Sequence, residues 1–352
     1  MKPLLENLAP GWLPPEWAPQ SAVMLTWPHE SADWWRWLDA VDRAFADFAR
    51  EIARRERVLI TVRDAAHEAR VRAALEAAGA ALDRIDFHRA PADDAWVRDH
   101  GPITVLREGA PVLLDFRFNG WGQKYDAAND DALTGRLQAL GAFGAVPVEP
   151  LGFVLEGGSI ETDGEGTLLT TTSCLLSPQR NPDWTREEIG ALLTRAFGVK
   201  RVLWLEHGAL AGDDTDGHID TLARFCDART IAWQSCDDPA DEHYPELKAM
   251  GDELAALRTA DGERYRLVAL PLPAAKHDED GMRLPASYAN FLIVNGAVLV
   301  PAYDDPADAV AAERLRRCFP EHEIVLLNGL PIVHQYGSLH CVSMQLPVGV
   351  IE

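Results

Sequence analysis

Five side chains that can carry acid–base and nucleophilic chemistry stand in similar contexts along the chain. Each lies beside a Gly or small-residue turn that leads into an expected strand; they are Asp99, Glu156, His218, Asp220 and Cys341. Carboxylates accept paired hydrogen bonds from a planar guanidinium, and a thiolate can add to its central carbon. The set therefore predicts a site for a flat cation, with a thiol as the nucleophile.

Cys341 is the expected nucleophile. It ends the turn Tyr336–Gly337–Ser338–Leu339–His340–Cys341, and the residues 342–345 after it alternate like a strand. Glycine removes the steric barrier of a Cβ and lets a substrate approach the sulfur closely. A buried core cysteine would show the same local pattern, so the other residues must support the assignment.

The remaining four residues supply the charges and protons that such a thiol requires. Asp99 and Asp220 could clamp the cation, and His218 could move protons because its ordinary pKa lies near neutrality. Glu156 could hold a second edge of the cation or steady His218. Structural roles are open too: Asp99 could pair with Arg98, Glu156 could accept from its glycine turn, and Asp220 could only orient His218.

The carboxylates pose a difficulty, because negative charges near a thiol raise its pKa. A bound guanidinium would offset this effect. One unit charge at about 4 Å, with an effective dielectric near 20, is worth roughly 4 kcal/mol, or about three pKa units. We therefore expect the substrate to help ionise the thiol that attacks it.

Metal and protease chemistry fit the sequence less well. The acidic turn at 212–217 resembles a calcium loop, but Gly212 and Ala223 would fall where carboxylates are needed. His218 and Asp220 have no third zinc ligand at a recognisable spacing. A cysteine protease would not need the additional carboxylates. We expect no metal and no other cofactor.

Residues so far apart need a framework that brings them together. A strand–helix–strand–strand order recurs in units of roughly 50–75 residues. Five units closed in a ring would bring the polar strand entrances to one axis; these are Asp99, Glu156–Gly157–Gly158, Gly217–His218, Asn290 and Cys341.

The pattern of apolar residues places the elements of these units. A strand at 22–27 precedes an amphipathic helix that Ser31 or Asp33 could cap. Further helices are expected at 65–78, 186–197, 244–258 and 307–318. A strand over 218–226 would place His218 and Asp220 on one face.

Composition narrows the class of protein. The 352 residues are 47% hydrophobic and show no linker, which favours one domain over 1–352. With 33 basic and 55 acidic residues, the net charge of −22 excludes nucleic acid as a partner and suits a small cation. Five widely spaced cysteines, no leader segment and no membrane-length apolar run favour a cytoplasmic protein.

The motifs, in this order, resemble those of the agmatine deiminases, in the bacterial-type peptidylarginine deiminase family of guanidino-group-modifying enzymes. The similarity runs from about Trp17 to Pro347, and its motifs are Trp96–Asp99 with Gly101–Pro102, Phe116–Gly122, Leu155–Ser159, Thr215–Asp220 and Ser338–Cys341. The resemblance implies an α/β protein with the five-bladed propeller, or pentein, fold. It also implies cofactor-free hydrolysis of agmatine to N-carbamoylputrescine and ammonia, as in putrescine biosynthesis, through an amidino-cysteine intermediate.

The resemblance also implies a role for individual residues. Cys341 matches the nucleophile, His218 the acid and base, Asp99 and Asp220 the guanidinium-binding carboxylates, and Glu156 the supporting acid. Eight further positions either belong to the expected substrate-binding set or mark where the chain departs from the family. Expected to bind substrate are Trp96, Asn119, Trp121, Gly157 and Asp214; departures stand at Gln20, Tyr336 and Ser338.

Substrate choice is the point that the departures affect most. The acidic loop with Asp213, Asp214 and Asp216 would attract the amine of agmatine and repel the carboxylate of free arginine. Peptidyl-arginine or another guanidine remains an alternative substrate. A non-catalytic propeller that binds a partner is an alternative of another class. The sequence leaves open whether the chain forms homo-oligomers.

Overall fold

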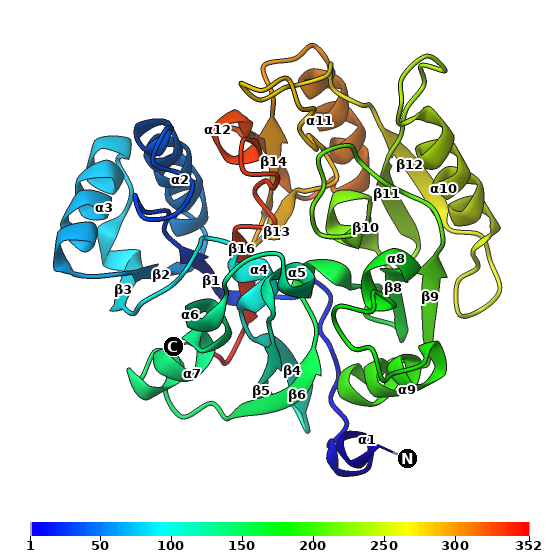
Figure 1. The fold of residues 1–352 in the computed structure, drawn as a ribbon, viewed down its shortest axis with the longest axis horizontal. Helices are drawn as coiled ribbons and strands as arrows, with labels where there is room; N and C mark the ends of the chain where they lie inside the picture. Colours follow the sequence, from blue (N-terminus) through cyan, green and yellow to red (C-terminus); the bar gives the residue numbers. More distant parts are fainter. Residues whose placement is uncertain (1, 352) are drawn as a thin grey trace.

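The computed structural model describes residues 2–351, whose strands form five small mixed sheets arranged around a centre (Figure 1). Every sheet follows one plan: its first strand is antiparallel to the second, which is parallel to the third. The sheet that contains the N-terminal strand has a fourth, parallel strand. The five-bladed α/β arrangement expected from the sequence is confirmed.

The strands of the five sheets are as follows. The first sheet holds β16 (Ser343–Pro347), β1 (Gln20–Thr26), β2 (Arg57–Val62) and β3 (Ile85–Arg89). The next two hold β4 (Ile103–Arg107), β5 (Ala110–Arg117) and β6 (Val148–Val154), then β7 (Glu161–Thr162), β8 (Thr167–Thr171) and β9 (Arg201–Leu205). The last two hold β10 (Ala223–Asp227), β11 (Thr230–Gln234) and β12 (Arg266–Leu270), then β13 (Leu292–Val294), β14 (Ala297–Ala302) and β15 (Glu323–Asn328).

Helices link the parallel strands, because a parallel pair requires a crossover connection. These crossover helices lie at the periphery in Figure 1 and are α2 (Leu38–Ala53), α3 (Ala65–Ala78), α7 (Leu133–Ala139), α9 (Arg186–Phe197), α10 (Tyr244–Ala256) and α11 (Ala307–Cys318). Shorter helices are α1 (Pro3–Asn7), α4 (Val97–His100), α5 (Gly120–Gln123), α6 (Ala128–Asp131), α8 (Thr172–Leu175) and α12 (Leu330–Val333).

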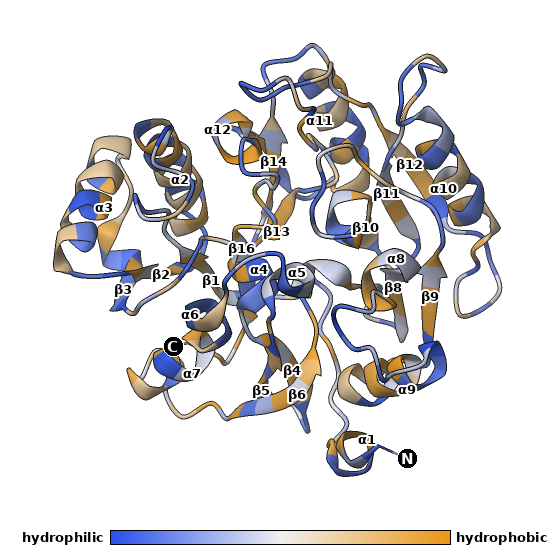
Figure 2. Ribbon diagram, viewed as in Figure 1, coloured by the Kyte–Doolittle hydropathy of each residue, from blue (hydrophilic) through white to orange (hydrophobic). Residues whose placement is uncertain are grey.

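Capping residues and apolar stripes explain the helix boundaries. The Asp64 side chain accepts the backbone N–H of His67 at the start of α3, and Gly79 ends that helix at φ 75°. The Thr185 and Glu188 side chains form a reciprocal capping box at α9. The crossover helices mix apolar and polar residues, whereas the strands they cover are largely apolar (Figure 2).

The two ends of the chain close the ring. β1 pairs with β16 on one side and with β2 on the other, and Met24 lies opposite Met344. Every side chain from Ala22 to Thr26 is buried. This closure fixes the segment that precedes β16, and with it Cys341.

Two local predictions were wrong. His218 and Asp220 do not lie on a strand: residues Ile219–Thr221 form a 3₁₀ turn, and β10 begins only at Ala223. The helix after β1 begins at Leu38 without a side-chain cap, so neither Ser31 nor Asp33 caps it. Helices α3, α9 and α11 match the expected ranges. Between residues 2 and 351, no helix combines the length and the apolarity that a membrane crossing requires.

Candidate active site

The candidate site collects residues from the segments that precede the first strand of each sheet. These segments are turns or single helical turns, and they lie outside the sheets. The residues are Asp99 in α4 before β4, Glu156 before β7, His218 and Asp220 before β10, Asn290 before β13, and Cys341 before β16. All six are at least nine-tenths buried. The five predicted catalytic residues thus lie in the same kind of position in successive units.

Gly158 is the point at which three of these side chains meet. A Cβ on Gly158 would lie 2.6 Å from His218 Nδ1, 2.8 Å from Asp99 Oδ1 and 3.1 Å from Asp220 Oδ2. The Gly158 N–H donates to Asp99 Oδ1 at 3.0 Å. Only a residue without a Cβ lets the histidine and the two carboxylates approach so closely.

Cys341 lies against this group. Its Sγ is 3.6 Å from Asp220 Oδ2 and accepts a hydrogen bond from Asn290 Nδ2 at 3.1 Å. Burial raises the pKa of the Cys341 thiol well above its ordinary value, and the charges of Asp220 and Asp99 raise it further. The ligand-free site therefore holds a protonated thiol at neutral pH.

Asp99 is ionised at neutral pH in spite of its burial. Its Oδ2 accepts the Trp121 indole N–H at 2.9 Å, which positions the carboxylate from the side opposite to Gly158. Burial raises the pKa of Asp99 to about 6, and Asp220 adds to this, while His218 opposes it. Both expected guanidinium-binding carboxylates thus face one small volume.

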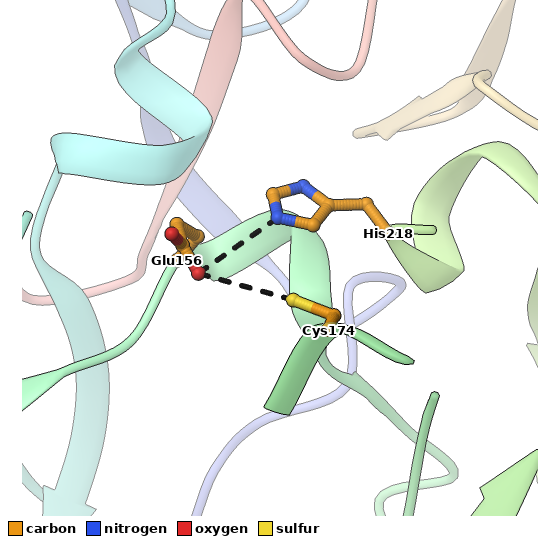
Figure 3. A group of neighbouring side chains, drawn as sticks. All are labelled: Glu156, Cys174 and His218. Carbon is orange, nitrogen blue, oxygen red and sulfur yellow. Dashed lines mark hydrogen bonds and ion pairs between the residues drawn. The ribbon is translucent and has the colours of Figure 1, made fainter. Parts of the chain in front are cut away.

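His218 lies between Asp99 and Glu156. Its Nδ1 is 3.5 Å from Asp99 Oδ1. Its Nε2 is 3.9 Å from Glu156 Oε2, and Figure 3 shows this second contact. Burial alone would lower the pKa of His218, but Asp99, Cys174 and Glu156 raise it well above its ordinary value. An imidazolium at this position can act as a proton donor at neutral pH.

Glu156 does not accept from its glycine turn; a buried arginine holds it. Arg180 Nε donates to both carboxylate oxygens of Glu156 at 2.9 Å, and Arg180 Nη1 donates to Asp216 at 2.5 Å. Burial raises the pKa of Glu156, but His218 and Arg180 bring it below its ordinary value. Glu156 is therefore a fixed negative charge behind His218.

Glu156, Cys174 and His218 are close enough to be considered as metal ligands, and their side chains converge in Figure 3. The Cys174 thiol donates to Glu156 Oε2 at 4.0 Å. A cation bound there would compete with Arg180, whose Nε already donates to both oxygens of Glu156. The same contacts serve a simpler purpose, since they fix the charge that faces His218.

A cavity of about 400 Å³ leads from the surface to Cys341. Trp96, Trp121, Phe118 and Tyr125 provide its aromatic walls. Among the residues of the described chain that line it, there are seven aspartates and no lysine or arginine; the aspartates are Asp33, Asp93, Asp94, Asp99, Asp126, Asp130 and Asp214. Such a wall attracts a cation and repels an anion.

Asp214 lies on this wall, as expected. The Tyr125 hydroxyl donates to Asp214 Oδ2 at 2.9 Å, and Lys124 donates to the Asp214 carbonyl and to Asp216. Burial raises the pKa of Asp214. The loop is therefore ordered from α5 and its following residues, which the sequence did not indicate.

Two of the expected substrate-binding residues are placed elsewhere. The Asn119 side chain accepts from Gly122 N–H and donates to the Gln179 carbonyl, which fixes the turn that carries Trp121. Gly157 packs against the Arg98 carbonyl and lines a separate, smaller cavity. The structure brings neither residue to the wall of the main cavity.

The departures from the family pattern have different surroundings. Tyr336 lines the main cavity in a left-handed backbone conformation, with φ 68°. Ser338 Oγ is 3.2 Å from the Tyr303 hydroxyl. Gln20 donates to the carbonyls of Glu16 and Ile293, in the closed ring of strands. Of the three, only Tyr336 can affect the shape of the cavity directly.

Sequence reasoning missed several residues of the site. Asn290 stood out as a polar strand entrance but received no role, although it donates to Cys341 Sγ. No sequence pattern distinguishes His340 from an ordinary neighbour of Cys341, yet its Nδ1 is 2.7 Å from Asp220 Oδ2. Arg180 lies in a Pro- and Asn-rich loop, where no periodic signal separates a buried arginine from a solvated one.

Comparison with known proteins gives consistent matches over nearly the whole chain. The model of the Porphyromonas-type peptidyl-arginine deiminase family matches residues 12–347. The agmatine deiminase of Stutzerimonas stutzeri is 37% identical, over 97% of this chain and 96% of its own.

Solved structures agree with this result. A Porphyromonas gingivalis protein, provisionally named an arginine deiminase, is 52% identical with a TM-score of 0.90, over 96% of this chain and 98% of its own. The C. jejuni agmatine deiminase, solved with substrate bound after one cysteine was replaced by serine, is 35% identical with a TM-score of 0.88, over 96% of both chains.

Proposed function

We infer the reaction of this chain from its site and its relatives together: the chain belongs to the Porphyromonas-type peptidyl-arginine deiminase family, and it is an agmatine deiminase. The observation that carries the proposal is the convergence of His218, Asp99 and Asp220 on Gly158, with Cys341 beside them. Curated relatives with full-length similarity are agmatine deiminases, and one solved relative holds substrate.

The proposed reaction begins with the guanidinium held between Asp99 and Asp220. Asp220 Oδ1 is buried and has no hydrogen-bond partner among residues 2–351, which leaves it free to accept from the substrate. The Cys341 thiol loses its proton to solvent, and its sulfur adds to the central carbon and forms an S–C bond. The C–N bond to one terminal nitrogen then breaks, and His218 gives that nitrogen the proton with which it leaves as ammonia.

Hydrolysis of the amidino-cysteine completes the cycle. His218, now neutral, takes a proton from a water molecule that attacks the same carbon. The S–C bond breaks, the new hydroxyl group gives its proton to the sulfur as the carbonyl forms, and N-carbamoylputrescine is released. One agmatine and one water thus give one N-carbamoylputrescine and one ammonia.

The substrate itself supplies the positive charge that favours ionisation of the Cys341 thiol. Burial and two carboxylates keep Cys341 protonated in the ligand-free site. A guanidinium about 4 Å away, at an effective dielectric near 20, contributes roughly 4 kcal/mol toward the thiolate. The Cys341 proton is then free to leave only when a cation fills the clamp, which limits reaction of the thiol with other electrophiles.

Agmatine is the proposed substrate because its far end is an amine. Trp96 and Trp121 flank the path of the aliphatic chain, and Asp214 lies further along the same wall. Free arginine would bring its carboxylate against these aspartates. Peptidyl-arginine and other guanidines are the alternative substrates. The P. gingivalis relative is provisionally named an arginine deiminase, which keeps arginine among the substrates to be tested.

Ammonia release tests the proposal. Purified protein is assayed with agmatine, free arginine and an arginine peptide with blocked ends, beside the Cys341→Ala variant. We expect release from agmatine in preference to the other two, and none from Cys341→Ala. Release chiefly from arginine or the peptide would replace the substrate, and no release from any guanidine would favour the non-catalytic binding module.

Three further properties remain predictions. We propose one catalytic domain over residues 1–352, a cytoplasmic location, and no nucleic-acid or membrane partner. Homo-oligomer formation is left open. Fractionation and analytical ultracentrifugation would test the location and the assembly.

A further inference from the structure

His340, the residue before Cys341, lies between two buried carboxylates. Its Nδ1 is 2.7 Å from Asp220 Oδ2, and its Nε2 is 2.8 Å from Glu16 Oε2. The exposed fractions are 1% for His340, 0% for Asp220 and 7% for Glu16. Glu16 comes from the segment before β1, so the three residues join the N-terminal segment, the β10 unit and the C-terminal turn.

The two short contacts determine how many protons the three groups hold. A neutral imidazole carries one N–H and one lone pair, so it can donate to only one of two ionised carboxylates. The second contact, at hydrogen-bond distance, requires a second proton. Glu16, His340 and Asp220 therefore hold two protons among them and one net negative charge.

The second proton does not belong to Glu16. Burial alone would raise the pKa of Glu16, but Arg224 and Arg98, together with His340, hold it far below its ordinary range. Arg224 Nη2 donates to Glu16 Oε2 at 2.7 Å. The second proton must therefore lie in the hydrogen bond between His340 and Asp220.

Other charged groups around this unit act in both directions. Burial lowers the pKa of His340, as do Arg224 and Arg98, while Glu16 and Asp220 oppose them. For Asp220, burial raises the pKa, but His340, His218 and Arg224 bring it below its ordinary value. Both pKa directions oppose a second proton on either group, and it is the two short contacts of His340 that require one. More distant neighbours are Glu161, which pairs with Arg224, and Glu56, whose charge acts on Glu16.

We propose that His340, supported by Glu16, is a positioning residue for the nucleophile: it holds Asp220 Oδ2, shares a proton with it, and leaves Oδ1 for the guanidinium. This inference rests on the proposed function. Asp220 Oδ2 is also the oxygen that lies 3.6 Å from Cys341 Sγ. A shared proton reduces the negative charge at that oxygen, so Cys341 ionises at a lower pH than it would beside a bare carboxylate.

The pH dependence of Cys341 alkylation tests this directly. Iodoacetamide modification of the Cys341 peptide is followed by mass spectrometry from pH 7 to 11 without substrate, because only the thiolate reacts, and the midpoint is fitted from the rise of the rate with pH. His340→Gln keeps an amide donor for Asp220 but cannot carry the second proton. We expect its alkylation midpoint to rise by about one pH unit or more. The reason is that the full negative charge of Asp220 would then lie 3.6 Å from Cys341 Sγ.

Glu16→Gln makes the sharper test, because Glu16 has no contact with Cys341. Without its negative charge His340 needs only one proton, so Asp220 regains its full charge and the midpoint rises in the same direction. For both variants we expect kcat for agmatine to fall about tenfold near pH 7 and to recover at higher pH, with KM less affected. His322→Gln, a histidine outside the site, is the matched control.

The outcomes separate this inference from the proposed function. Midpoints within about 0.3 unit of wild type in folded His340→Gln and Glu16→Gln would overturn the positioning role, even in an active enzyme. If His340→Gln does not fold, Glu16→Gln alone decides. A wild-type protein that hydrolyses no guanidine would overturn the proposed function, whereas the alkylation profile would still report on the proton.

Discussion

Replacing Gly158 by alanine should disable the site while leaving the fold intact. The backbone at Gly158 does not have the left-handed conformation that would strain alanine. The added Cβ, however, would lie 2.6 Å from His218 Nδ1 and 2.8 Å from Asp99 Oδ1, where ordinary contact begins at 3.4 Å. His218 would have to move by about 0.8 Å to restore ordinary contact, 3.4 − 2.6 Å.

The magnitude follows from that displacement. A misplacement of about 1 Å costs on the order of 100-fold in rate, which corresponds to roughly 2.7 kcal/mol of transition-state stabilisation. Overpacking by one methyl group costs about 1–3 kcal/mol of folding stability, which a domain of this size tolerates. We therefore expect Gly158→Ala to lose about two orders of magnitude in kcat/KM for agmatine and to unfold cooperatively.

Ammonia release and urea unfolding are the two assays. Gly152→Ala in β6 is the matched control, since nothing lies within 4 Å of its added Cβ and its φ is also not left-handed. We expect Gly152→Ala to keep wild-type activity. Gly158→Ala with more than about a third of wild-type kcat/KM would refute the claim that the three side chains must meet at that glycine.

Three further predictions concern charges. Activity should fall as the pH drops through about 6, where Asp99 becomes protonated, and Trp121→Phe should move this midpoint up by about one unit because it removes a donor to the carboxylate. Burial raises the pKa of Asp130 to about 8. Its folded-state pKa exceeds the unfolded value, so this stability is fully present below pH 4 and is lost as pH rises through 8; Asp130→Asn should gain at least about 1 kcal/mol over wild type between pH 5 and 8. Arg180→Met should lose about 3 kcal/mol in urea unfolding, since Glu156 would keep a buried unpaired charge.

Each of these predictions has a control in the same chain. Trp35→Phe, at an exposed tryptophan, should leave the acidic limb unchanged. Exposed Asp237→Asn should show no gain between pH 5 and 8. Arg54→Met removes an exposed guanidinium from Glu51, which Arg50 and Arg55 still hold, and should cost less than about 1 kcal/mol. Equal effects in a variant and its control would contradict the corresponding prediction.

Much of the fold is visible in the sequence because its signals are local. The apolar alternation of 57–62 and the helix range 65–78, ended by Gly79, follow from periodicity and capping alone. The strand predicted from His218 fails for a physical reason. Its alternation is real, but the Thr221 N–H and hydroxyl both donate to the His218 carbonyl and hold a turn, and the ladder begins only at Ala223.

The site residues also divide into those that the sequence singles out and those that only the structure identifies. Asp99, His218 and Cys341 are unusual residue types at turns, so position and chemistry together single them out. Arg180 and Glu16 lack such a signal, because a charged residue in a loop is ordinarily solvated, and its burial depends on partners distant in sequence. Long-range ion pairs of this kind require the structure.

The repeated plan of the sheets explains why one of the missed residues, Asn290, could have been anticipated. If every unit contributes the residue before its first strand, the β13 unit must contribute one too, and Asn290 is the polar residue there. Its amide donates to Cys341 Sγ rather than binding a cation, and an amide donor is the neutral group that stabilises a thiolate without competing for the guanidinium. Four units thus supply acids, a base and a nucleophile, and the fifth supplies a donor for the negative charge that the others create. Asn290→Ala should then raise the Cys341 alkylation midpoint, and an unchanged midpoint would limit the shared design to four units.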